Sequence, residues 1–182
     1  KVVDEMNNSK QVKTKQRVTD HGEVFTSSKE VNAMLDLVSQ ETENINSTFL
    51  EPACGTGNFL VEILRRKLAI VERRYSKNQV EFERYAIAAL CSIYGVEKME
   101  DNTKECRQRI LGVFTHFYIN NFKKVKTEFL RVAEFLLKRN ILCGDALSLR
   151  DSNKQPIVFS EWAFVMGSKI KRRDFIFEEL IP

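Results

Sequence analysis

An apolar stretch that runs into a glycine turn and then into an amphipathic segment constrains the fold of this chain most strongly. Residues 48–50 are apolar or β-branched and are followed by Glu51-Pro52, which ends the stretch. Residues 55–57, Gly-Thr-Gly, supply a tight turn, and apolar side chains then recur at helical spacing from Leu60 to Val71. A buried strand that turns directly into a helix is typical of α/β proteins.

Two further apolar stretches, residues 93–97 and 140–145, have strand character and are separated from the first and from each other by helical patterns. We expect Asp101 or Asn102 to cap one of the intervening helices. The alternation predicts an α/β fold with a mostly parallel sheet flanked by helices, in which right-handed crossovers cover both faces.

The two ends of the chain carry weaker patterns. We expect residues 1–16, which are polar and basic, to form a flexible arm, and residues 17–182 to form one domain. Ser27 and Glu30 make a capping box for a helix over about residues 28–39. Near the other end, strands or edge segments joined by the basic residues 169–173 are expected, with Trp162 as an anchor or a base-stacking group.

Composition limits the class of protein. With 182 residues, of which 43% are hydrophobic and 30% charged, the chain can form one globular core without disulfide bonds or metal ions. The longest apolar stretches are far shorter than a membrane span, so we expect a cytoplasmic protein without a membrane partner. Its four cysteines form no C-x-x-C pair, so we predict no metal site. A net charge of +4 permits a polyanionic partner.

Each of the three predicted strands ends in an acidic residue, namely Glu51, Glu97 and Asp145. Ligands of parallel α/β sheets bind at the carboxyl ends of the strands, so these acids are candidate ligand-binding groups. Leu60 stands where a dinucleotide-binding turn would carry its third glycine, which disfavours an oxidoreductase. A ligand with an adenosine, no pyrophosphate and a positively charged centre fits these residues better.

Four stretches together resemble a known family. They are Phe-Leu-Glu-Pro-Ala-Cys-Gly-Thr-Gly-Asn-Phe at residues 49–59, Thr-Asp-His-Gly-Glu-Val-Phe-Thr-Ser at 19–27, Ile-Tyr-Gly-Val-Glu at 93–97 and Ile-Leu-Cys-Gly-Asp-Ala-Leu at 141–147. In order and spacing they resemble the cofactor-binding motifs of S-adenosylmethionine-dependent N6-adenine DNA methyltransferases of restriction–modification systems, although Ser27 stands where proline is usual. The resemblance covers residues 17–148 and implies a Rossmann-like methyltransferase fold.

The resemblance also implies roles for single residues. Glu97 would accept hydrogen bonds from the ribose hydroxyls, and Asp145 would accept one from the adenine amine. Phe25 and Thr26 would close over the methionine part of the cofactor. The full set of implied S-adenosylmethionine-binding residues is Phe25, Thr26, Glu51, Ala53, Cys54, Gly55, Gly57, Glu97, Asp145 and Ala146.

One motif of that family is missing. Its members carry Asn, Asp or Ser followed by Pro-Pro and an aromatic residue, whereas the only prolines here, Pro52, Pro156 and Pro182, are not adjacent. The catalytic motif therefore either lies beyond Pro182 or is absent, and no catalytic residue is predicted. We expect that the C-terminal part of the fold is incomplete and that these 182 residues alone do not methylate DNA.

Two functions remain open after this comparison of motifs. The first is a DNA (adenine-N6) methyltransferase, or its cofactor-binding part, that acts on double-stranded DNA with other restriction–modification subunits as partners. The alternative is a catalytically inactive subunit that binds S-adenosylmethionine or DNA and works with a partner chain.

Overall fold

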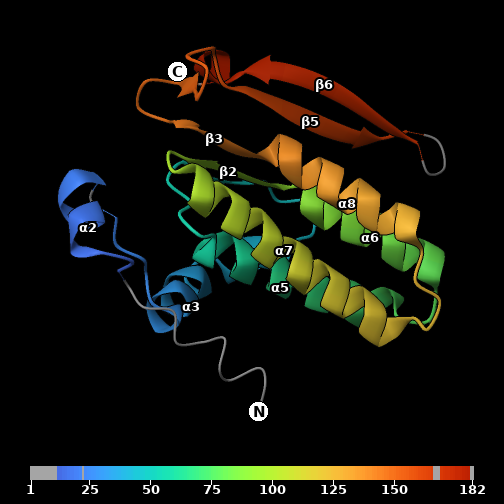
Figure 1. Ribbon diagram of the computed structural model, residues 1–182. Helices are drawn as coiled ribbons and strands as arrows, with labels where there is room; N and C mark the ends of the chain where they lie inside the picture. The colour runs from blue at the N-terminus through green and yellow to red at the C-terminus, as the bar shows by residue number, and fades with distance from the viewer. Residues whose placement is uncertain (1–11, 22, 166–168, 181–182) are drawn as a thin grey trace.

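The computed structural model describes residues 12–21, 23–165 and 169–180, and its centre is a small, mostly parallel sheet (Figure 1). The strand order is β1-β2-β3-β4. The bounds are Phe49–Glu51 for β1, Ile93–Glu97 for β2, Ile141–Asp145 for β3 and Arg150–Asp151 for β4. β1 and β3 each pair parallel to β2, and β4 pairs antiparallel to β3. The predicted α/β class with a mostly parallel sheet is therefore confirmed.

Long helices make the connections between the parallel strands. α5 and α6 lie between β1 and β2 in the chain, and α7 and α8 lie between β2 and β3. The helices are α2 (Lys15–His21), α3 (Ser28–Asp36), α4 (Ser39–Thr42), α5 (Asn58–Tyr75), α6 (Gln79–Cys91), α7 (Glu100–Asn121), α8 (Thr127–Asn140) and the 3₁₀ helix η1 (Phe177–Leu180). None of the helices in the described part of the chain is long and apolar enough to cross a membrane.

The prediction that helices cover both faces of the sheet is wrong. Ile93 and Ile141 belong to one core with α5–α8, whereas Val96 packs against Ile157 and Phe159 in a second, smaller core. Figure 1 shows α5–α8 on one side of the sheet and the C-terminal segment on the other. Because each crossover steps to the next strand in the same direction, crossovers of one hand place their helices on one face.

The C-terminal segment is a hairpin of β5 (Val158–Phe164) and β6 (Ile170–Ile176). The basic residues Lys171, Arg172 and Arg173, predicted to lie in a connection, belong instead to β6 and are exposed. Trp162 anchors the hairpin, since its indole Nε1 donates a hydrogen bond of 2.8 Å to Asn140 Oδ1 and its ring lies edge-on to Phe135.

Two helix boundaries differ from those predicted. The capping box of Ser27 and Glu30 is present, but α3 ends at Asp36 and the separate α4 follows it. α7 begins at Glu100, so the predicted caps Asp101 and Asn102 lie within its first turn. The reason is that the Met99 N–H, next to this turn, donates to the Glu97 carboxylate at 2.8 Å.

The N-terminal residues of the described chain contact the folded body. Lys13 Nζ donates to Asn102 Oδ1 at 2.7 Å and pairs with the Glu105 carboxylate at 2.8 Å. α2 begins at Lys15, within the predicted flexible arm. Residues 12–16 are thus attached to α7, whereas residues 1–11 of that arm lie outside the described residues.

Candidate functional site

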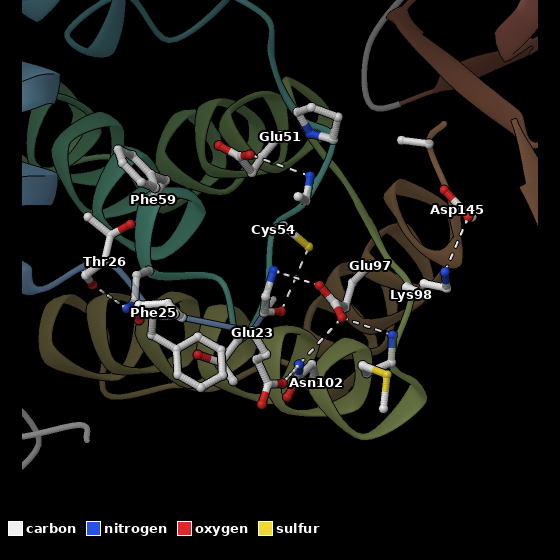
Figure 2. A pocket seen from close by; sticks show the side chains of 18 of the residues that line it. Glu23, Phe25, Thr26, Glu51, Cys54, Phe59, Glu97, Lys98, Asn102 and Asp145 are labelled. Carbon is white, nitrogen blue, oxygen red and sulfur yellow. Dashed lines mark hydrogen bonds and ion pairs between the residues drawn. The ribbon is translucent and has the colours of Figure 1, made fainter. Parts of the chain in front are cut away.

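A cavity of about 570 Å³ lies at the carboxyl ends of β1, β2 and β3 (Figure 2). Nine of the ten residues implied by the family resemblance line it: Phe25, Thr26, Glu51, Ala53, Cys54, Gly55, Glu97, Asp145 and Ala146. These residues come from four stretches of the chain that are far apart in the sequence. The parallel sheet brings them together because its strands end at one edge.

Gly57, the tenth residue, does not line the cavity and has a packing role instead. Its φ of +86° is left-handed, and it is the N-terminal cap of α5 without a side-chain cap bond. A Cβ at this position would lie 2.5 Å from Cys106 Sγ on α7. The absence of a side chain at Gly57 therefore lets α5 begin close against α7.

Glu97 accepts hydrogen bonds from two turns of the site. Its Oε2 accepts a 2.9 Å hydrogen bond from the Gly55 N–H, and its Oε1 accepts one of 2.8 Å from the Met99 N–H. The residue is buried. Asn102 Nδ2 donates a third, longer bond of 3.4 Å to Glu97 Oε1. A carboxylate has about four acceptor positions, so one of them is left for a ligand. The two backbone bonds hold the carboxylate in a fixed orientation.

The other two strand-end acids are held more loosely. Asp145 Oδ1 accepts a 2.9 Å hydrogen bond from the Leu147 N–H, and Asp145 Oδ2 lies 3.5 Å from Lys98 Nζ. The backbone bond, together with the ammonium group, lowers the pKa of Asp145. Glu51 accepts one long bond of 3.4 Å from the Ala53 N–H. Asp145 is therefore ionised at neutral pH and able to accept hydrogen bonds.

One wall of the cavity is formed by the segment 23–27, which carries Phe25 and Thr26. The Thr26 carbonyl accepts a 2.7 Å hydrogen bond from Asn58 Nδ2 at the start of α5. Asn58 Oδ1 in turn accepts one of 2.7 Å from Arg109 Nη1, and Arg109 also donates to the Thr56 carbonyl. This chain of bonds fixes the wall segment and the glycine turn relative to α7.

Glu23, Asn58, Lys98 and Asn102 line the cavity but were not predicted from the sequence. Glu23 Oε1 accepts a hydrogen bond of 2.7 Å from Arg17 Nη2. It accepts a second one of 2.6 Å from Asn102 Nδ2 (Figure 2). Glu23 lies inside the stretch 19–27, and that position was its only signal. Nothing in the local pattern indicates that its carboxylate reaches α7.

Cys54 lines the cavity but is not poised as a nucleophile. Its hydrogen bond with Cys106, together with burial, raises the pKa of the Cys54 thiol. The thiol therefore stays protonated at neutral pH. Among the described residues, no group of three His, Cys, Asp or Glu side chains is arranged to hold a metal ion.

Comparison of the chain with protein-family models, with curated proteins and with solved structures finds no match. The chemistry of the cavity and the motifs that surround it are therefore what indicate a function.

Proposed function

We propose that this cavity binds S-adenosylmethionine and that the chain is a DNA (adenine-N6) methyltransferase, or its cofactor-binding part, with a Rossmann-like methyltransferase fold. The observation that carries the proposal is the convergence of Glu51, Glu97 and Asp145 with the wall segment 23–27 around one cavity. These are the stretches that resemble the cofactor motifs of the family.

The residues present fit the chemical groups of this cofactor. A cavity of about 570 Å³ is within the range of small-molecule sites. Carboxylates suit the ribose hydroxyls, the adenine amine and the positively charged methionine part. α5 begins at the cavity with Asn58 and Phe59 in its lining and with no side-chain cap, so its free N–H groups suit the carboxylate of the methionine part.

In this proposal each group binds or orients one part of the cofactor. The Glu97 carboxylate accepts from the ribose hydroxyls, and Asp145 accepts from the adenine amine. Phe25 and Thr26 cover the methionine part, held in place by Asn58. The cofactor supplies an activated methyl group, and the residues of this chain fix its position and exclude water from it.

Methyl transfer to adenine needs a second set of residues, which would receive the base after it leaves the duplex. The chain has three prolines and none is adjacent to another, so the Pro-Pro-aromatic motif for that task is absent from these residues. The second candidate function, a catalytically inactive subunit that binds S-adenosylmethionine or DNA beside a partner chain, needs no such motif in these residues. Double-stranded DNA and other restriction–modification subunits are the proposed partners in both cases.

Reading the gene past the codon for Pro182 separates the two candidates: a downstream Asn-Pro-Pro-Tyr-like motif favours the enzyme, and an early stop favours the subunit. Transfer of a tritiated methyl group to unmethylated double-stranded DNA tests these residues by themselves. We expect no incorporation above a heat-inactivated control, and incorporation would show that other residues replace the missing motif.

Calorimetry tests the cofactor itself. We expect S-adenosylmethionine and S-adenosylhomocysteine to bind and NAD not to bind. Glu97→Gln replaces the carboxylate by an amide, so it should weaken binding by about 1.5–3 kcal/mol, or roughly 10- to 150-fold in Kd. Glu134→Gln, an exposed acid on α8 outside the cavity lining, is the matched control and should leave Kd unchanged.

Two results would contradict the proposal. If neither cofactor form binds at millimolar concentration, or if NAD binds instead, the assignment of the cavity is wrong. If Glu97→Gln binds as well as the unchanged protein, Glu97 does not contact the ligand.

A further inference from the structure

Glu23 is a buried acid in the cavity wall, and one of its two carboxylate oxygens accepts no hydrogen bond from the described residues. Its side chain is only 7% exposed. Oε1 accepts hydrogen bonds from Arg17 and Asn102, whereas Oε2 is buried and has no hydrogen-bond partner among the described residues. A buried carboxylate oxygen without a partner is costly, and a cationic ligand group near it would lower that cost.

The charges around the cavity do not cancel. The lining includes four carboxylates, of Glu23, Glu51, Glu97 and Asp145, but only one ammonium group, of Lys98. Lys98 pairs with Asp145, at 3.5 Å. Glu51 and Glu97 accept hydrogen bonds from uncharged N–H groups of the described residues.

Arg17 neutralises Glu23 only in part. The guanidinium of Arg17 is shared, since Nη2 pairs with Glu23 at 2.7 Å and Nη1 pairs with Asp101 at 2.7 Å. Asp101 also lies 3.3 Å from Lys13 Nζ, which pairs with Glu105 as well, so three carboxylates share two positive charges at this wall. The charged side chains that line the cavity are mostly negative, and low-dielectric walls strengthen their field.

We infer that Glu23 makes this cavity selective for S-adenosylmethionine over S-adenosylhomocysteine, by favouring the sulfonium charge that only the first ligand carries. This inference rests on the proposed function. Both ligands have the same adenosine, ammonium and carboxylate groups, so their recognition cannot separate them. With Glu97 and Asp145 assigned to ribose and adenine, Glu23 and Glu51 remain for the methionine part, and of these two Glu23 belongs to the same wall segment as Phe25.

The expected preference can be stated as a ratio of dissociation constants. A unit charge several ångströms from a carboxylate, at an effective dielectric constant of about 20, shifts an equilibrium by roughly tenfold or more. The demethylated product should therefore bind at least about tenfold more weakly than the methyl donor. Such a difference favours release of the product after each transfer.

Calorimetry on the full 182-residue chain measures this ratio. Three ligands are compared: S-adenosylmethionine, S-adenosylhomocysteine and sinefungin, in which an ammonium replaces the methylated sulfonium. We expect the two cationic ligands to bind more tightly than the neutral-sulfur ligand. Glu23→Gln keeps an oxygen that can accept from Arg17 and Asn102 but removes the charge, so it should reduce the preference at least about threefold. Glu134→Gln changes the net charge equally and should leave the preference intact.

Every other outcome contradicts the inference, and one of these outcomes also contradicts the proposed function. If the unchanged protein binds neither ligand, the proposed function fails first. If it binds both with equal affinity, only the inference fails. If Glu23→Gln weakens the binding of both ligands by the same factor, or of neither, Glu23 holds the wall in place without selecting the charged ligand.

A second variant covers the case in which Glu23→Gln does not fold, as judged by circular dichroism. Asp101 is half-exposed and lies outside the cavity lining, and it competes with Glu23 for Arg17. Asp101→Asn leaves Arg17 free to neutralise Glu23, so the preference should fall. An unchanged preference in Asp101→Asn would overturn the inference.

Discussion

Gly57 offers the sharpest test of the packing at the start of α5. Its φ of +86° lies in the left-handed region, where a side chain is strained. In addition, an alanine Cβ at this position would lie 2.5 Å from Cys106 Sγ and 3.4 Å from Cys106 Cβ. Cys106 is fully buried within α7, so it has little room to move away.

The cost of Gly57→Ala follows from these two effects. The left-handed conformation costs a residue with a side chain about 1–2 kcal/mol. Overpacking a close-packed core costs about 1–3 kcal/mol more. We therefore expect the free energy of unfolding to fall by about 2–5 kcal/mol, a large fraction of the roughly 5–15 kcal/mol typical of a folded protein.

Urea denaturation followed by far-ultraviolet circular dichroism measures this loss. Gly112→Ala is the matched control, because nothing lies within 4 Å of the added Cβ on the same helix, α7. It should stabilise the protein by about 0.5–1 kcal/mol, since alanine has the higher helix propensity. Gly57→Ala combined with Cys106→Ala should recover the steric part of the loss. A Gly57→Ala protein as stable as the parent would refute the reasoning.

Two further predictions concern residues outside the cavity. Burial lowers the pKa of Lys67 from its usual 10.5 to about 7 in the folded protein, so the unfolded chain binds more protons between these values. The free energy of unfolding should therefore rise above about pH 7, and urea denaturation of Lys67→Met should show a smaller rise than the unchanged protein. Arg109→Gln should weaken the binding of S-adenosylmethionine severalfold, as measured by calorimetry, because Arg109 holds Thr56 and Asn58 in place. An equal affinity would show that Arg109 does not position the site.

The sequence was sufficient for the strands that form the cavity floor. Glu51, Glu97 and Asp145 each follow a short apolar stretch, and parallel strands end at one edge of a sheet. Their convergence could therefore be predicted before any contact was known. The same local reasoning placed the capping box at Ser27, because its two partners are three residues apart.

Features that depend on distant residues could not be predicted in this way. The role of Gly57 depends on Cys106, and the cap of α7 depends on the carboxylate of Glu97. The position of Glu23 depends on Arg17 and on Asn102, which lies 79 residues away in the sequence. Local patterns report secondary structure, whereas these roles arise from tertiary contacts.

The anchoring of the C-terminal hairpin makes the protein's own fluorescence informative. Trp162 is the only tryptophan in the chain, and its indole bonds to Asn140, whose Nδ2 donates to the carbonyls of Leu90 and Ile93. Trp162 is not among the cavity-lining residues. Its emission therefore reports whether the hairpin is docked on α8, while circular dichroism reports the helical layer. A fluorescence transition at lower urea than the dichroism transition would identify the hairpin as a separately unfolding unit.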